Sequence, residues 1–193
     1  MKVRSRLVLA LVAGVVAAVL AVVALPTTAG AAPYCGITWG SLPKSTAEMT
    51  GAHITGVRPG RHDCFDRLVV DLAGKPAPGY DVRYIDRPYR APGTGDALSV
   101  AGGAVLQIIA RAPAYDENGN ATVPWRGAGT AIVRPGQFQA GGFRTFRHLV
   151  WGGTYEGQSS FGLGVRARLP FRVFTLDGPG TGSRLVVDVA HRW

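Results

Sequence analysis

Arg67-Leu68-Val69-Val70-Asp71 returns, residue for residue, as Arg184-Leu185-Val186-Val187-Asp188. Each copy adjoins a second shared pattern, over residues 80–88 and 171–179: an aromatic residue, any residue, Val, any three residues, Asp, any residue and Pro. All four segments are short, rich in β-branched and aromatic residues, and bounded by Gly or Pro, which is typical of strands. A domain that opens and closes with matching strands is expected to be closed or two-layered, with its ends meeting in space. Chance is the alternative explanation, because Val-Val-Asp is common in strands.

The pattern around these segments predicts an all-β protein. Alternation puts Leu68, Val70 and Leu72 on one face of a strand, with Arg67, Val69 and Asp71 on the other. We expect about nine strands, forming an antiparallel β-sandwich or a partly closed barrel. No stretch predicts a convincing amphipathic helix. The expected strands are 53–58, 65–72, 80–85, 98–100, 104–112, 143–151, 159–168, 171–176 and 184–190.

Glycine and proline mark the expected connections. Pro59-Gly60-Arg61 predicts a turn after the first strand. Ala101-Gly102-Gly103 predicts a hairpin that joins 98–100 to 104–112, and the second of these strands is apolar enough to be central. Residues 113–136 are expected to form a long loop, a kind of segment that is often functional or mobile.

The N-terminal residues 1–31 resemble an export signal. They contain a basic start, the uninterrupted apolar run Leu7–Leu25 and the small residues Ala29-Gly30-Ala31, where a signal peptidase would cut. An uncleaved membrane anchor is the alternative, because this run is long enough to span a bilayer. We therefore divide the chain into a secretion signal at 1–31, an N-terminal arm at 32–50 and a β-domain at 51–193.

The positive charge of the chain favours anionic partners. The formal net charge is +9, and it falls to +6 without Lys2, Arg4 and Arg6 of the signal. Wall polymers and lipid head groups are candidate neighbours. Nucleic acid is not an expected partner of an exported protein, and membrane contact is expected only if the apolar segment stays uncleaved.

The two cysteines, Cys35 and Cys64, predict one disulfide in an oxidising compartment. This bridge would pin the irregular segment 37–50 onto the first long strand, where Trp39 would cover a hydrophobic surface. The alternative is that Cys64 acts as a nucleophile beside His62. We favour the bridge, because a bridged sulfur cannot attack a substrate.

One cluster of titratable residues stands out, at the expected junction of a turn and a strand. His62, Asp63 and Asp66 lie close in sequence, and a histidine with nearby carboxylates is suited to acid–base work. A polar network that satisfies a buried histidine and fixes the turn is the interpretation we favour. Ligand contact by His62, Arg58 or Arg67 is the alternative.

Other patterns give weak signals for chemistry. Ser159 and Ser160 lack the spacing of a nucleophile elbow, and the four histidines are not spaced as metal-ligand pairs. Residues 116–120 have oxygens at alternate positions, but their glycine is misplaced for a calcium loop, so a polar turn is favoured. We therefore expect no catalytic residue, metal or cofactor.

Aromatic residues in loops are candidate platforms for stacking a sugar ring. Trp125, Tyr115 and Tyr89 fall in expected loops, where their ring faces would be accessible to a sugar. Trp151 and Trp39 are expected to pack in the hydrophobic core or to cover an apolar surface. For each of these residues packing within the fold is the favoured interpretation.

The run Val57–Leu72, with its core Arg-x-Gly-x-His-x-x-Phe-Asp-Arg, resembles the start of the AMIN-like domain, a family found in secreted and lipid-anchored proteins of high-GC Gram-positive bacteria. Phe161–Arg166, Pro170–Phe174, Pro179 and Arg184–Val189 resemble its other end. The resemblance would cover about residues 51–192.

The resemblance implies a β-sandwich that binds without catalysis. The wider AMIN group consists of targeting modules in periplasmic amidases and secretins, and in amidases the module binds peptidoglycan. We thus expect a secreted, extracellular or cell-wall-associated module for peptidoglycan or an anionic wall polymer. The alternative is a protein-interaction module that scaffolds an exported partner. The expected ligand contacts are Arg58, His62, Arg67, Tyr84 and Arg166.

Overall fold

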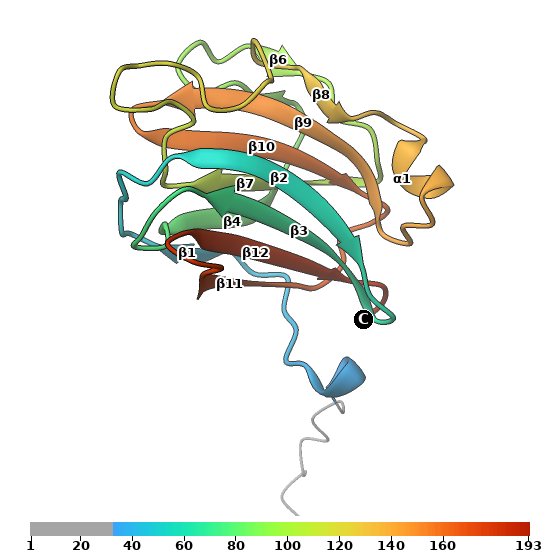
Figure 1. The fold of residues 1–193 in the computed structure, drawn as a ribbon. Helices are drawn as coiled ribbons and strands as arrows, with labels where there is room; N and C mark the ends of the chain where they lie inside the picture. The colour runs from blue at the N-terminus through green and yellow to red at the C-terminus, as the bar shows by residue number, and fades with distance from the viewer. Residues whose placement is uncertain (1–32) are drawn as a thin grey trace, which may run out of the picture. The chain divides into compact units, whose positions relative to one another are not determined.

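Two antiparallel sheets face one another across a hydrophobic core in the computed structural model, which describes residues 33–193 (Figure 1). The predicted signal at 1–31 lies outside the described residues. One sheet has four strands, in the order β11 (Phe171–Asp177), β12 (Ser183–Ala190), β3 (Phe65–Leu72) and β2 (Ile54–Arg61). The other has six strands, in the order β1 (Lys44–Thr46), β4 (Tyr80–Ile85), β7 (Ala104–Ala110), β10 (Gln158–Val165), β9 (Phe146–Tyr155) and β8 (Ala131–Val133).

Three small elements complete the described residues. β5 (Tyr89–Arg90) and β6 (Ala97–Leu98) form a two-stranded ribbon, and the helix α1 (Gln137–Ala140) precedes β9. A single 3₁₀ turn lies at Tyr34–Gly36. No helix within residues 33–193 is long and apolar enough to cross a membrane.

The two copies of the repeated pentapeptide are neighbouring strands. β3 and β12 pair in antiparallel register, so that Arg67 stands opposite Asp188 and Asp71 stands opposite Arg184. This confirms that the opening and closing strands meet in space. The second shared pattern, at residues 80–88 and 171–179, does not mark equivalent strands. Its two copies form β4, which lies in the six-stranded sheet, and β11, which lies in the four-stranded sheet.

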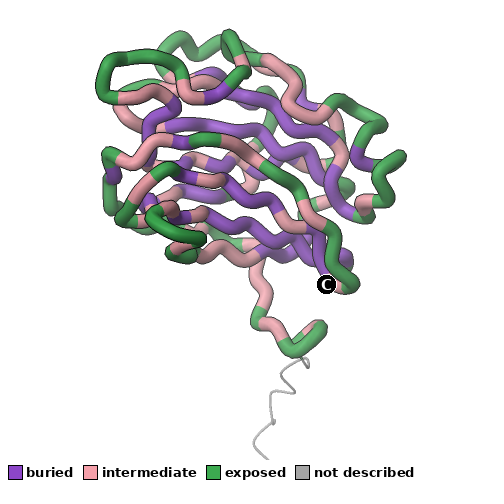
Figure 2. The backbone as a smooth tube through the Cα atoms, in the orientation of Figure 1, coloured by how far each residue is buried: buried purple, intermediate pink, exposed green. Residues whose placement is uncertain are grey.

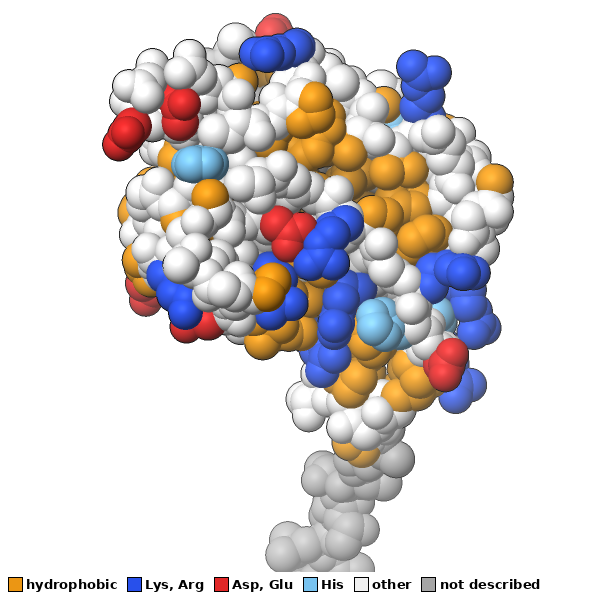
Figure 3. Space-filling view, viewed as in Figure 1, with side chains coloured by type: hydrophobic (Ala, Val, Ile, Leu, Met, Phe, Trp, Pro, Cys, Tyr) orange, Lys and Arg blue, Asp and Glu red, His pale blue; other side chains and the backbone are white. Residues whose placement is uncertain are grey.

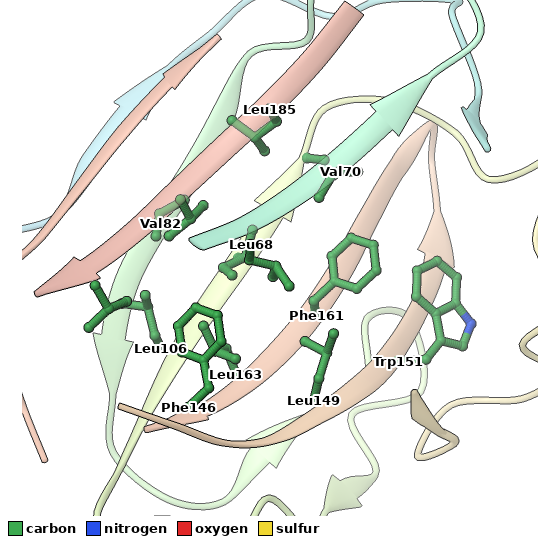
Figure 4. Close-up of a cluster of buried hydrophobic side chains, with 14 of the residues drawn as sticks. Leu68, Val70, Val82, Leu106, Phe146, Leu149, Trp151, Phe161, Leu163 and Leu185 are labelled. Carbon is green, nitrogen blue, oxygen red and sulfur yellow. The ribbon is translucent and has the colours of Figure 1, made fainter. Parts of the chain in front are cut away.

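The core lies between the inner faces of the two sheets. Leu68 and Val70 of β3 and Leu185 of β12 are fully buried against side chains of the opposite sheet, including Leu106, Leu149, Phe161 and Leu163 (Figure 4). Figure 2 shows the interior strands as mainly buried, whereas the edge strand β2 is largely intermediate or exposed. The predicted inward face of β3 is confirmed. Each such Leu or Phe contributes about 1.5–3 kcal/mol by its burial.

The sandwich interpretation is confirmed, and the barrel alternative is wrong because the sheets keep open edges at β2, β11, β1 and β8. Twelve strands occur within residues 33–193, where about nine were expected. The additional strands are β1, β5 and β8, each two or three residues long. Strands this short carry no detectable alternation. The helix α1, four residues long, was missed for the same reason.

The turn predicted at Pro59-Gly60-Arg61 is wrong. β2 continues through these residues to Arg61, and the chain reverses at His62–Cys64, where the His62 amide donates to the Phe65 carbonyl at 3.0 Å. Pro59 is tolerated because β2 is an edge strand and can lack a donor on its outer side.

The hairpin predicted between 98–100 and 104–112 is also wrong. β6 pairs with β5 instead, and the segment that carries them packs on the outer face of the six-stranded sheet. There Tyr89 and Val100 are buried against Val105 and Val150. Gly162 makes the close approach possible, because a Cβ at that position would lie 2.7 Å from the Tyr89 ring. The central position of β7 is confirmed.

The N-terminal arm is pinned as expected. Cys35 and Cys64 form a disulfide, and the Trp39 ring lies 5.8 Å from that of Phe65. Trp39 therefore covers an apolar residue on the outer face of β3. The arm also contributes β1 to the edge of the six-stranded sheet beside β4.

Candidate functional site

A cavity opens where β2 turns into β3 and where β12 ends. Its volume is about 480 Å³. Figure 3 shows Lys and Arg side chains gathered around this end of the domain, next to a histidine. The cavity is lined by Arg61, His62, Asp63, Asp66, Gly142, Arg144 and His191.

A buried aspartate–histidine contact forms the inner wall of the cavity. Asp66 is fully buried, and its Oδ1 lies 3.1 Å from Nε2 of His191, which is itself 3% exposed at the side chain. The other carboxylate oxygen accepts hydrogen bonds from the amides of Thr145 at 2.6 Å and Phe146 at 3.1 Å. Asp66 therefore ties β3 of one sheet to the start of β9 in the other.

The histidine in this pair has no ring nitrogen left for proton transfer to a ligand. Its Nε2 faces Asp66, and its Nδ1 lies 3.2 Å from the Asp63 carbonyl oxygen. Both partners, the Asp66 carboxylate and the Asp63 carbonyl, are hydrogen-bond acceptors. The polar network expected around a buried histidine is present, but the buried histidine is His191. His62 is exposed, and its ring stacks on Phe65 with centroids 4.4 Å apart.

Two arginines at the mouth of the cavity are available to a ligand. Arg61 ends β2 and Arg144 precedes β9, and both are exposed. Among residues 33–193, neither guanidinium forms an ion pair with a protein carboxylate. Gly142 leaves the space that Arg61 occupies, because a Cβ at Gly142 would lie 2.6 Å from Arg61 Nη1. The backbone of Gly142 has φ +78°, a conformation that also favours glycine.

Further arginines add positive charge behind this wall. Arg166 donates from Nη2 to the His191 carbonyl oxygen at 2.7 Å. Burial lowers the pKa of Arg147, and the nearby charge of Arg166 lowers it further. An anion at this end of the domain would relieve part of that repulsion.

A second charged cluster lies on the outer face of the four-stranded sheet. Asp188 is fully buried, and it accepts from Arg67 at 2.6 and 2.9 Å and from Arg172 at 2.7 Å. The two guanidinium groups lie over the rings of Phe65 and Phe174, with 5.1–5.4 Å between each guanidinium carbon and the ring centroid. These arginines cover the apolar outer face of the sheet, and Nε of each is bound to the Asp188 carboxylate.

The structure brings together only two of the five expected ligand contacts. His62 lines the cavity, and Arg166 contacts the backbone of His191 behind it. Arg58 lies on β2 and pairs with Asp71, with hydrogen bonds of 2.6 and 2.9 Å. Arg67 belongs to the outer-face cluster around Asp188.

Tyr84 lies apart from the cavity, on the inner face of β4. Its hydroxyl donates to the Leu169 carbonyl oxygen at 2.6 Å and accepts from the Leu169 amide at 3.0 Å. Burial raises the pKa of Tyr84 to about 12. Its hydroxyl thus links β4 to the segment before β11.

Sequence reasoning missed Arg61, Arg144 and His191. His191 directly follows β12, and Arg61 lies in the segment that was assigned to a turn. Each comes from a different part of the chain, so no local sequence motif predicts the cavity. The one available signal was the resembling run 58–67, which contains both Arg61 and Asp66.

The structure gives no support to the calcium-loop, cysteine-nucleophile or metal-site patterns within residues 33–193. Asp116 Oδ1 accepts from the amides of Asn118 and Asn120 at 3.0 and 2.8 Å, which is the polar turn we favoured. Cys64 is bridged and carries no free thiol. Within residues 33–193, no three His, Cys, Asp or Glu side chains are grouped to hold a metal.

Comparisons with known proteins add one finding. A protein-family model described as the AMIN-like domain matches residues 52–191, most of the described chain. Neither a curated protein nor a solved structure gave a significant match.

Proposed function

Because the chain belongs to the AMIN-like domain family, we propose that it is an exported module that binds peptidoglycan or an associated anionic wall polymer without chemical conversion. The family is one of cell-envelope modules, which generally bind or scaffold. Its members are typically extracellular, and the Cys35–Cys64 disulfide is consistent with an oxidising compartment.

The observation that carries the proposal is the pair of exposed arginines at the mouth of the cavity at the end of β2, whose lining also includes the exposed carboxylate of Asp63. Within the part of the chain that the structure describes, Arg61 and Arg144 present guanidinium groups without an ion-pair partner, and His62 lines the same cavity. A guanidinium fork matches a carboxylate or a phosphate, which are the anionic groups of wall peptides and wall polymers. The buried Asp66–His191 pair holds the wall of the cavity rigid behind these side chains.

The same geometry argues for binding rather than hydrolysis. Both ring nitrogens of His191 already contact protein oxygens, of Asp63 and Asp66, and Cys64 is held in a disulfide. General acid–base catalysis needs a group within hydrogen-bond reach of the substrate with a proton to give or take. An enzyme based on His62 would lose turnover without losing affinity on His62→Ala, whereas a binding role predicts weaker affinity.

The test is sedimentation of residues 33–193 with isolated cell walls across a range of salt concentrations. We expect saturable pelleting that weakens as salt rises, because exposed charges are screened. The double variant Arg61→Gln, Arg144→Gln should bind at least about tenfold more weakly, since charge-assisted hydrogen bonds contribute roughly 1.5–3 kcal/mol each. The matched control is Arg58→Gln, whose guanidinium is already paired with Asp71.

Two results would overturn the proposal. Failure to pellet even at low salt would remove wall polymers as ligands and would bring forward the alternative, a scaffold for an exported protein. Equal pelleting of the double variant and the Arg58 control would show that this cavity is not the binding site. In that case the outer-face arginines Arg67 and Arg172, together with Arg166, would be mapped next.

A further inference from the structure

A second cavity, of about 320 Å³, lies at the opposite end of β9 from the cavity lined by Arg61 and Arg144. Its lining comes from the long connection before β8 and from the last residues of β9. The lining is mainly apolar, with Ala114, Val123 and Ala128 beside the indole rings of Trp125 and Trp151. Its volume lies within the range of small-molecule sites.

Trp125 supplies an aromatic surface to this cavity. It is only partly buried, although its ring lies 5.5 Å from Trp151 and 6.1 Å from Phe161, centroid to centroid. The core therefore holds one side of the indole in a fixed orientation. The remaining exposed part faces a cavity that the same residue lines.

Trp151 supplies a hydrogen-bond donor. The residue is 4% exposed, and its indole nitrogen donates to no protein acceptor among residues 33–193. Within residues 33–193, the side-chain nitrogens that are both fully buried and without a hydrogen-bond partner are His148 Nε2 and Arg184 Nε. Trp151 Nε1 has no partner but is not one of these fully buried atoms, so part of the small exposed area of Trp151 belongs to its nitrogen. Figure 4 shows this nitrogen on the side of the ring that points away from Phe161 and the other labelled core residues.

A third contribution comes from Arg126. Its exposed guanidinium lines the cavity and makes no ion pair or hydrogen bond within the described residues. The cavity thus combines an aromatic face, an unpartnered and nearly buried N–H, small apolar side chains and a free arginine. Its side chains offer donors to a ligand and little that would accept from one.

We propose that this second cavity binds the N-acetylated sugar ring of a glycan. An acetamido group has a carbonyl oxygen that can accept from Trp151 Nε1 and a methyl group that fits among Ala114, Val123 and Ala128. The apolar face of the sugar ring would stack on Trp125, and its hydroxyls would accept from Arg126. The inference rests on the proposed wall binding and deepens it, because it assigns the glycan strand and the anionic groups to different cavities.

The test titrates residues 33–193 with triacetylchitotriose and measures tryptophan fluorescence and binding heat. Cellotriose, which has the same rings without acetamido groups, is the control ligand. We expect saturable binding of triacetylchitotriose, at least about tenfold tighter than that of cellotriose. Trp125→Ala should weaken binding at least about tenfold.

Two further variants separate a binding effect from a folding effect. Ala128→Phe places a ring in the cavity from an exposed position and should abolish binding while leaving the core contacts of Trp125 intact. Trp39→Phe removes a tryptophan that packs on Phe65 at the outer face of the other sheet, and it should leave binding unchanged. The thermal midpoint of each variant is measured in parallel.

The outcomes distinguish this inference from the proposed function. Equal affinity for the two trisaccharides, or unchanged affinity in Ala128→Phe, would overturn the assignment of the sugar site. If walls pellet but triacetylchitotriose does not bind, the sugar site is refuted and wall binding stands. If walls do not pellet, the proposed function fails, and the trisaccharide titration still decides the sugar site by itself.

Discussion

Asp188→Asn should strongly destabilise the outer face of the four-stranded sheet. Asp188 is fully buried, and its two oxygens accept three hydrogen bonds from Arg67 and Arg172. An amide at this position keeps one acceptor but loses the charge and turns an N–H toward a guanidinium. Removing one partner of a buried ion pair generally costs about 3–5 kcal/mol, because the remaining charge stays uncompensated.

The expected loss lies at the lower end of that range. The side chains of Arg67 and Arg172 are 24% and 31% exposed, so water can still solvate part of each orphaned guanidinium. We therefore expect the free energy of unfolding to fall by about 3 kcal/mol. For a domain of this size the loss corresponds to a decrease of about 6–12 °C in the thermal midpoint.

The repeated pentapeptide provides a matched control. Asp71 holds the same position in the first copy that Asp188 holds in the second, but it pairs with Arg58, whose side chain is 57% exposed. Asp71→Asn should cost at most about 1 kcal/mol. Urea unfolding of both variants, with the slopes compared, measures the difference. If the two substitutions cost the same within about 0.5 kcal/mol, burial does not set the strength of these pairs and the reasoning is wrong.

Two other perturbations test separate parts of the structure. Replacing both Cys35 and Cys64 with Ser should lower the free energy of unfolding by about 3–4 kcal/mol, because the bridge closes a loop of 29 residues in sequence separation. Calorimetry checks this, and a native-like far-ultraviolet spectrum with an unchanged midpoint would contradict it. Burial lowers the pKa of His148 below its usual 6.5, so the unfolded state takes up this proton first as pH falls. The stability associated with neutral His148 should therefore be complete above about pH 6.5 and be lost as pH falls through the lower folded-state pKa. Urea midpoints between about pH 7.5 and pH 5 should fall less steeply in His148→Gln, and an identical slope would refute the assignment.

The long strands could be predicted because each carries its own pattern. β3 and β4 have the expected bounds, since alternating apolar residues between glycines and prolines specify them locally. The short edge strands β1 and β8 have no such pattern and exist only because a longer strand is present beside them. At Pro59 the local turn signal was overridden by the register of β2 against β3.

The candidate site was predictable only in part, for a related reason. His62 and Asp66 were found because they fall within one recognisable run. His191 meets Asp66 across 125 residues of sequence, and nothing near either residue indicates the contact. Arg166 was expected on the surface, but its place at the His191 carbonyl depends on how both sheets end. Chemistry assembled from the ends of several strands is visible only after the fold is known.

The pairing of β3 with β12 has a consequence for how the chain reaches its fold. The last strand is an interior strand of its sheet, and it joins residues as far apart as Arg67 and Asp188, which are separated by 121 positions. Contacts of such high sequence separation slow folding, because a large loop must close before they form. Until β12 arrives, one edge of β3 stays unpaired and can template association with another chain. The molecule is therefore most vulnerable to aggregation late in folding, and any version that lacks its final strand keeps that vulnerability permanently.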